Sequence, residues 1–248
     1  MTWQKKVEQA YGFPGILAEG PQHFCPGCSH GIMAKILSEV LGEMGLKERA
    51  VGVYGTGCSL LFHDYIEIRG VAAPPGSAPA VAAGLKEAMS DALVFTYQGE
   101  SDLASGFAHL LSAATRADRI TIICENNFTM GMAGGAMSLT TPLGLKTTTT
   151  PQGRTAEAHG FPFKVAESVA QMRGVAYAAR GSTHSPGAVK RVKRMVQKAF
   201  ENQLYGIGTG FVEVLGMCPT NLDMRPKDLA LKMREFAETL PLGELKIP

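Results

Sequence analysis

The sequence predicts an α/β fold with a central parallel sheet flanked by helices, and three observations predict it. Apolar, β-branched runs alternate with helix-like patterns, and each run is followed by glycine or a polar turn. The 248-residue chain is 45% hydrophobic and 19% charged, which is enough to bury one sizeable core. Because no linker or internal repeat divides it, we expect residues 1–248 to form a single domain.

The elements follow from these patterns in chain order. Apolar runs predict buried strands over Ala50–Tyr54, Leu93–Tyr97 and Ile120–Cys124. Helical periodicity lies between them, over Gly31–Met44, Ala78–Ser90 and Leu103–Thr115. A segment rich in Gly, Met and Thr, Phe128–Arg154, is longer than an ordinary connection and predicts a functional loop. Regular structure then resumes with Phe163–Met172 (helix), Gly174–Ala178 (strand), Pro186–Asn202 (helix), Gly210–Leu215 (strand) and Pro226–Thr239 (helix).

Composition and charge exclude several classes of protein. A formal net charge of +2 gives no reason to expect nucleic acid or an anionic membrane as the partner. The start, Met1–Gln9, does not resemble a secretory signal, and the weakly polar stretch Gly70–Leu85 holds too many prolines and glycines to span a membrane. We therefore expect a cytoplasmic protein, in which five cysteines indicate metal or redox chemistry rather than disulfides.

An acidic turn and an asparagine pair follow two consecutive strands. Glu100 and Asp102 come after Leu93–Tyr97, whereas Asn126 and Asn127 come after Ile120–Cys124, and ligands of open α/β sheets bind at such strand ends. With 24 residues between Ser101 and Asn126, the spacing resembles the thiamine-diphosphate motif, in which a carboxylate and an amide hold Mg²⁺. That resemblance gives Glu100, which replaces the motif's Asp, together with Asn127 and the Thr129 carbonyl as Mg²⁺ ligands, and Asp102 is an alternative carboxylate. Gly99 and Ser101, the latter in place of the motif's second Gly, are points of backbone approach to the phosphates. The alternative is an ordinary turn with a surface acid.

Four of the cysteines lie at predicted strand ends or helix starts. They are Cys25 and Cys28 in Cys-Pro-Gly-Cys, Cys58 after the first strand, and Cys218 before Pro219. Thiolates gathered from three segments favour an iron–sulfur cluster. A zinc site remains an alternative, and for Cys25 and Cys28 alone so does a thioredoxin-like redox pair. Cys124 ends a buried strand and is interpreted as a core residue.

Taken together, these motifs resemble the β subunit of the 2-oxoacid:ferredoxin oxidoreductases, in the short form of the 2-oxoisovalerate and 2-oxoglutarate enzymes. The resemblance covers residues 24–221. It depends on Cys25-Pro-Gly-Cys-Ser-His30, Gly57-Cys58, Ala78–Gly84, Tyr97–Ser105, Gly131–Gly135, Thr140–Arg154 and Cys218-Pro-Thr-Asn221. Four positions differ from the family pattern: Pro75 and Ser77, in Pro75-Gly76-Ser77 in place of His-Gly-Arg, Met130 in place of Tyr, and Ala136 in place of Gln.

The resemblance implies a thiamine-diphosphate-binding fold with three cofactors: thiamine diphosphate, Mg²⁺ and a [4Fe–4S] cluster on Cys25, Cys28, Cys58 and Cys218. The residues it implies around thiamine diphosphate are Thr56, Gly57, Cys58, Ser59, Gly99, Ser101, Asp102, Gly131 and Met132, and we add His30 beside the cysteine motif. The implied reaction is oxidative decarboxylation of a 2-oxoacid to acyl-coenzyme A and CO₂, with electrons passed through the cluster to ferredoxin. No catalytic residue is assigned here, because the activating glutamate is expected on a partner.

The implied partners are a pyrimidine-domain α subunit and, in some enzymes, ferredoxin-like γ and δ subunits. Two alternatives stay open: a non-redox thiamine-diphosphate decarboxylase subunit, and a non-catalytic cluster-bearing subunit for electron transfer or assembly. Ser59–Phe62 lacks the basic residue typical of relatives that accept 2-oxoglutarate, and with Met130 and Met132 this indicates a branched or aryl apolar substrate. The basic helix surface from Lys190 to Lys198 is interpreted as solvated, with docking of ferredoxin or coenzyme A phosphates as the alternative.

Overall fold

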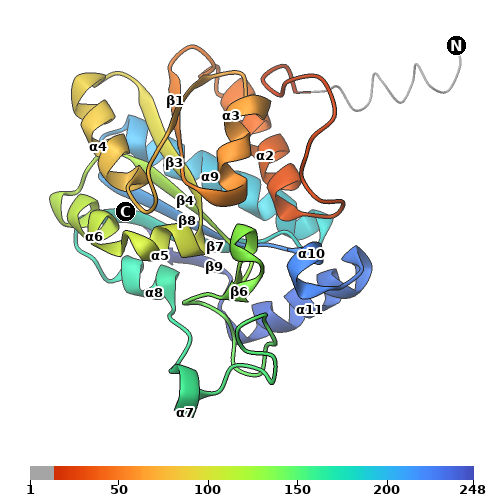
Figure 1. Cartoon of the computed structure of the whole chain (residues 1–248). Helices are drawn as coiled ribbons and strands as arrows, with labels where there is room; N and C mark the ends of the chain where they lie inside the picture. The colour runs from red at the N-terminus through yellow and green to blue at the C-terminus, as the bar shows by residue number, and fades with distance from the viewer. Residues whose placement is uncertain (1–13) are drawn as a thin grey trace, which may run out of the picture.

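The computed structural model describes residues 14–248 and contains a seven-stranded sheet in the order β2-β1-β3-β4-β8-β7-β9 (Figure 1). Its strands are β1 (Ala50–Tyr54), β2 (Arg69–Ala72), β3 (Leu93–Gly99), β4 (Thr121–Asn126), β7 (Val175–Ser182), β8 (Thr209–Leu215) and β9 (Gly243–Lys246). All neighbouring strands pair in parallel except β9, which is antiparallel to β7. A separate antiparallel pair is formed by β5 (Thr129–Met130) and β6 (Ala136–Met137). The predicted parallel α/β sheet is therefore confirmed.

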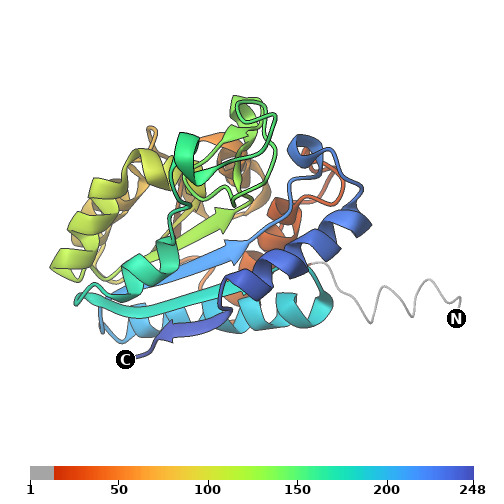
Figure 2. The ribbon, with the colours of Figure 1, turned by 90° about the horizontal axis from the view of Figure 1, so that it is seen from below.

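Helices cover both faces of the sheet (Figure 2). They are α2 (Ser29–Glu43), α3 (Phe62–Tyr65), α4 (Ala78–Ala88), α5 (Glu100–Ser105), α6 (Phe107–Arg116), α7 (Ala156–His159), α8 (Val165–Ala170), α9 (Pro186–Leu204), α10 (Pro219–Leu222) and α11 (Pro226–Thr239), with 3₁₀ turns η1 (Gly57–Leu61) and η2 (Gly131–Ala133). No helix between residues 14 and 248 is long and apolar enough to cross a membrane.

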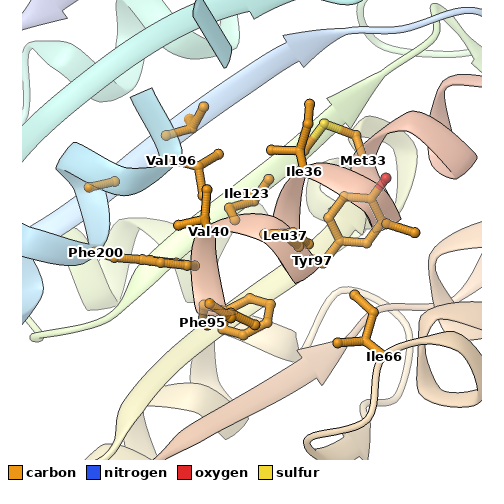
Figure 3. Packing of buried hydrophobic residues seen from close by; sticks show 14 of the residues in the cluster. Met33, Ile36, Leu37, Val40, Ile66, Phe95, Tyr97, Ile123, Val196 and Phe200 are labelled. Atoms are coloured by element: carbon orange, nitrogen blue, oxygen red, sulfur yellow. The ribbon is translucent and has the colours of Figure 1, made fainter. Parts of the chain in front are cut away.

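Successive strand residues point to opposite faces and so divide the core into two layers. On β3, Phe95 and Tyr97 pack beneath α2 and α9, whereas Val94 packs beneath α4 and α6. Figure 3 shows the first layer, in which α2 side chains such as Leu37 pack in one cluster with Phe95 of β3 and Phe200 of α9. Because both faces are covered, the strands are hydrophobic without alternation, which is why their positions could be predicted from sequence. Cys124 is fully buried in the second layer, as expected of a core residue.

The strand order brings four loops to one edge of the sheet. Strands β1, β3, β4 and β8 are consecutive neighbours and run in the same direction, so their carboxyl ends lie side by side. The segments that follow them are Thr56–Ser59, Gly99–Asp102, Asn127–Thr129 and Met217–Cys218. The pairing of β3 with β4 confirms the prediction that the acidic turn and the asparagine pair follow adjacent strands.

Two parts of the fold differ from the sequence prediction. The single helix expected over Leu103–Thr115 is two helices that meet at Gly106, where a Cβ atom would lie 2.0 Å from the carbonyl oxygen of Gly76. This close backbone approach positions the 73–77 loop and interrupts the helix. The edge strands β2 and β9 were not predicted, because β2 is largely exposed and β9 is short and polar.

Candidate functional site

A cavity of about 350 Å³ opens at the carboxyl edge of the sheet. Its walls include every residue predicted to bind the cofactor and every predicted Mg²⁺ ligand: His30, Thr56, Gly57, Cys58, Ser59, Gly99, Glu100, Ser101, Asp102, Asn127, Thr129, Gly131 and Met132. Pro75, Ser105, Met130 and Ala133 complete the lining. The structure thus gathers residues from loops that are far apart in sequence around one space, which we call the cofactor cavity.

Asp102 joins three of these loops through its carboxylate. Its Oδ1 accepts hydrogen bonds from the backbone N–H and hydroxyl of Thr56 and from the backbone N–H of Gly76 at 3.0 Å, and its Oδ2 accepts from Gln98 Nε2 at 2.8 Å. Gly55 allows this approach, since a Cβ there would lie 2.3 Å from Asp102 Oδ2. With its oxygens taken by donors from three segments, Asp102 organises the site.

Glu100 is also hydrogen-bonded by the protein, but burial dominates its environment. It begins α5 and is almost fully buried, and the side-chain hydrogen bond to its Oε1 comes from Ser101 Oγ at 3.2 Å. Burial raises the pKa of Glu100 to about 7, against weaker opposing hydrogen bonds. A buried carboxylate facing a cavity is stabilised by a cation, so Glu100 fits the carboxylate role better than Asp102.

The segment after β4 bends sharply at Phe128, a buried residue with φ of +66°. Asn127 Oδ1 accepts from the backbone N–H and the hydroxyl of Thr129, both at 3.2 Å, and Asn127 Nδ2 donates to Glu125 Oε2 at 3.3 Å. Thr141 holds the bend by donating to the Phe128 carbonyl at 2.6 Å. These bonds fix the amide of Asn127, and both Asn127 and Thr129 line the cavity.

The cysteine corner, which we define as Cys25, Cys28, Cys58 and Cys218, borders this cavity. All four are free thiols, and Cys25 is exposed. Asn221 Nδ2 donates to Cys218 Sγ at 3.3 Å and to the Gly131 carbonyl at 3.0 Å, and a Cβ on Gly131 would lie 4.0 Å from Cys58 Sγ. Gly131 therefore lies between the corner and the cavity.

Charge on any one of these thiols is felt by the others. Burial, followed by the nearby charge of Cys218, raises the pKa of Cys58 to about 11, and burial raises the pKa of Cys28 far above its usual range. Burial also raises the pKa of Cys218. Between residues 14 and 248, no three His, Cys, Asp or Glu side chains converge tightly enough for a single metal ion. A multi-iron cluster is wider than one ion, and its positive charge would offset the repulsion among the thiolates.

A buried polar chain connects α2, which begins directly after Cys28, to strands β3 and β4 of the sheet. His30 Nδ1 lies 2.6 Å from the Tyr97 hydroxyl, and His30 Nε2 lies 3.4 Å from Glu125 Oε2. Burial lowers the pKa of His30 to about 4 and raises the pKa of Glu125 well above its usual range. His30 is therefore a neutral residue, and its contact with Glu125 is not an ion pair.

Comparison with known proteins decides the family. Residues 55–207 match the family described as thiamine pyrophosphate enzyme, C-terminal TPP binding domain. The 2-oxoglutarate synthase subunit KorB of Methanocaldococcus jannaschii is 32% identical over 87% of this chain and 78% of its own length. The chain belongs to the β-subunit family of the 2-oxoacid oxidoreductases. Another relative of this β subunit, the ketoisovalerate oxidoreductase subunit VorA of Methanothermobacter thermautotrophicus, is 39% identical over 81% of this chain, which spans only 42% of VorA.

The fold of the β subunit is shared with a solved structure. The 2-oxoglutarate:ferredoxin oxidoreductase from Magnetococcus marinus, with 2-oxoglutarate, coenzyme A and succinyl-CoA bound, superposes with a TM-score of 0.79. That match covers 94% of this chain and 84% of the other, at 23% identity. It shows that both chains have the same architecture.

Several site residues escaped the sequence prediction. Gln98 and the Gly76 N–H hold Asp102, and Asn221 connects Cys218 to Gly131. Asn221 could have been found from its place in Cys218-Pro-Thr-Asn221, but the partners of Asp102 come from loops whose proximity only the strand order reveals. Nothing in the sequence indicated that Glu125 contacts His30, since it showed only a charged residue at the end of a strand.

Proposed function

We propose that this chain holds Mg²⁺–thiamine diphosphate in the cofactor cavity and a [4Fe–4S] cluster on the cysteine corner, as the β subunit of a 2-oxoacid:ferredoxin oxidoreductase. The reaction is oxidation of a 2-oxoacid with coenzyme A and two oxidised ferredoxins to acyl-coenzyme A, CO₂, two reduced ferredoxins and one proton. The relatives named after 2-oxoacid oxidoreductases support this proposal, since their similarity spans most of the chain.

One observation carries it. The loops that follow four neighbouring strands bring together the buried carboxylate of Glu100, the fixed amide of Asn127 and the thiols of Cys58 and Cys218. Gly131, which lines the cavity, lies beside both Cys58 and Asn221. A decarboxylase without redox chemistry has no need for four free thiols beside its cofactor. This arrangement therefore favours the oxidoreductase over the non-redox alternative.

The residues present fit both groups. Glu100 supplies a buried carboxylate on the cavity wall, and Asn127 and Thr129 supply oxygens from the segment after the neighbouring strand, which is the hard-ligand set that Mg²⁺ prefers. Glu100 is one methylene longer than the aspartate of the usual motif, and it starts α5 directly at the cavity wall. The free thiols of the cysteine corner are the donor type that iron–sulfur clusters take.

Thiamine diphosphate, when bound, supplies the carbanion stabilisation that decarboxylation of a 2-oxoacid requires. The chain's own residues position it: Asp102 fixes the Thr56 and Gly76 loops, and the bend at Phe128 fixes the amide of Asn127. No residue of the cavity is assigned as a catalytic acid or base. We place the activating glutamate on the α subunit, which would close the open side of the cavity.

The cavity wall favours an apolar substrate side chain. Met130, Met132, Pro75 and Ala133 contribute apolar surface, and neither Lys nor Arg lines the cavity within the described residues. A second carboxylate, as in 2-oxoglutarate, would meet neither Lys nor Arg among the described residues of the cavity wall. Leu60 does not line the cavity, so the substrate inference depends on the methionines. Similarity to VorA, which is named for ketoisovalerate, points to a branched 2-oxoacid.

The test is coenzyme A-dependent reduction of methyl viologen by the anaerobically purified complex of this chain with its partner subunits. We expect a kcat/KM for 2-ketoisovalerate or an aryl 2-oxoacid at least tenfold above that for 2-oxoglutarate, since a buried unpaired carboxylate costs more than about 1.4 kcal/mol. Preference for 2-oxoglutarate would refute the substrate assignment. Dye reduction by none of these acids would refute the oxidoreductase proposal and favour a non-catalytic, cluster-bearing subunit.

A further inference from the structure

The basic residues of α9 fall into two groups with different surroundings. Lys193 pairs with Glu39 and Glu43 of α2, at 2.9 and 2.6 Å, and Lys198 pairs with Glu244 of β9 at 2.8 Å. These two lysines stabilise the packing of α9 against its neighbours. The interpretation of this helix as an evenly solvated basic surface therefore does not hold for them.

The remaining cations are exposed and continue onto α11. Arg191 of α9 and Lys227 and Arg234 of α11 are exposed and make no ion pair with any residue between 14 and 248. Burial lowers the pKa of His184, and the charges of Arg191 and Arg234 lower it further, so both guanidinium groups lie near this one side chain. The two helices lie on the same side of the molecule in Figure 2.

An apolar residue lies among these cations. Leu231 is 58% exposed and stands four residues after Lys227 and three before Arg234, on the same stripe of α11. We call Arg191, Lys227, Leu231 and Arg234 the basic face. An exposed apolar centre with a charged rim is typical of protein interfaces, and an unpaired cationic rim fits an acidic partner.

The basic face adjoins the cysteine corner. Pro226, which precedes Lys227, lies against the turn between Cys25 and Cys28: a Cβ on Gly27 would come within 2.5 Å of Pro226 Cγ. On the α9 side, Thr183 precedes His184, and its Oγ1 lies 2.7 Å from Oγ of Ser29, the residue after Cys28. A protein seated on the basic face is thereby brought beside Cys25, which is exposed.

We propose that the basic face is the docking surface for an acidic ferredoxin that takes electrons from the cysteine corner. This inference depends on the proposed function. Electron transfer weakens steeply with distance, so the acceptor must dock close to the corner, and Cys25 is its exposed member. Each docking event reduces one ferredoxin by one electron, and two such events complete the two-electron oxidation of one 2-oxoacid.

The test reverses charge on the basic face in the intact complex with the double substitution Lys227→Glu and Arg234→Glu. Glutamate in the first turn of α11 suits the helix dipole. Loss of the Arg234 charge removes one of the causes that lower the pKa of His184, so folding should be preserved. The matched control is Arg119→Glu with Arg173→Glu, which changes net charge equally at the opposite edge, just before β4 and β7. The probe is a purified acidic [4Fe–4S] ferredoxin, with binding measured directly at low and high salt.

We expect K227E/R234E to raise the Kd for ferredoxin roughly tenfold at low ionic strength, with the difference shrinking at high salt, and the control pair to leave Kd unchanged. Equal effects of the two pairs, or none, would overturn the proposal. A rise in KM for coenzyme A with unchanged ferredoxin binding would assign the face to coenzyme A phosphates and also overturn it.

Methyl viologen reduction by the same preparations separates this inference from the function on which it depends. The dye needs no docking surface, so the ratio of ferredoxin-dependent to dye-dependent reduction should fall in K227E/R234E only. If the unsubstituted complex reduces neither ferredoxin nor dye with any 2-oxoacid, the proposed function fails. If it reduces both, and the ratio is the same in all variants, only the docking proposal fails.

Discussion

The cofactor cavity and the cysteine corner occupy the same edge of the sheet but are held together in different ways. In the cavity, Asp102 accepts hydrogen bonds from three separate segments, and the bend at Phe128 is fixed by Thr141. In the corner, Asn221 donates to Cys218, while burial and mutual repulsion disfavour the thiolates. The cavity is thus preorganised by the protein, whereas the corner depends on the metal that it is proposed to bind.

A third site shows that a buried charge in this fold can also be neutralised by other side chains of the protein. Arg180, almost completely buried, pairs with Glu213 at 2.7 Å and with Glu167. These acids neutralise the cation without any ligand, and burial alone is therefore not a signal of function here. Glu100 and the four thiols differ from Arg180, because between residues 14 and 248 their charged forms have no salt-bridge partner of opposite charge.

The largest effect is expected from removing one thiol. Cys218→Ser should abolish the iron content of this subunit and the visible absorbance of iron–thiolate charge transfer, because the proposed cluster would lose one of its four thiolate ligands. Thiamine diphosphate binding should persist, since the cavity is held by Asp102. The control is Cys124→Ala, in the core layer beneath α4 and α6, which should retain iron. Equal iron in both variants would contradict the assignment of the corner.

Removing the carboxylate that joins the loops should damage both folding and binding. Asp102→Ala leaves the N–H groups of Thr56 and Gly76 and the amide of Gln98 without an acceptor, so we expect the free energy of unfolding to fall by roughly 2–4 kcal/mol. Denaturant titration measures this, with the exposed Asp64→Ala as the control. A change below about 0.5 kcal/mol would show that the cavity is not organised by Asp102.

Glu100 provides a test of the metal role that is separate from folding. Glu100→Gln keeps the shape and should weaken Mg²⁺-dependent thiamine diphosphate binding on the order of 100-fold, measured by titration at several Mg²⁺ concentrations. Glu100→Asp restores the residue of the usual motif and should stay within about tenfold of the unsubstituted protein. If Gln and Asp behave alike, Glu100 is not the metal ligand.

The smallest effects test the close approach of two loops. A Cβ at Gly106 would lie 2.0 Å from the Gly76 carbonyl oxygen, so Gly106→Ala should cost roughly 1–3 kcal/mol of stability. The control, Gly84→Ala in the middle of α4, meets no atom within 4 Å and should stabilise the protein by about 0.4–1 kcal/mol. Thermal unfolding distinguishes the two, and destabilisation by both would contradict the account of the Gly106 break.

The sequence predicted the sheet well because its strands are buried on both faces and read as continuous apolar runs. The resemblance to the family named residues that line the cavity, and those in Thr56–Ser59, Gly99–Asp102 and Asn127–Thr129 lie where the ends of neighbouring strands meet. The sequence could not choose between Glu100 and Asp102 as the proposed metal ligand, since only the fold shows that Asp102 accepts hydrogen bonds from Thr56, Gly76 and Gln98 and that Glu100 is almost fully buried. The neutral state of His30 was equally hidden, because it results from burial beside Tyr97 and Glu125.

The central claim is that one edge of the sheet holds both a cluster and Mg²⁺–thiamine diphosphate. The most direct measurement is quantification of iron, sulfide and thiamine diphosphate on a single anaerobic sample of the complex, beside its Cys218→Ser variant. We predict one thiamine diphosphate per copy of this chain in both samples, and a loss of four irons and four sulfides per copy in the variant. Iron without thiamine diphosphate in the unsubstituted complex would contradict the claim. This chain would then be a cluster-bearing subunit whose cavity binds no thiamine diphosphate.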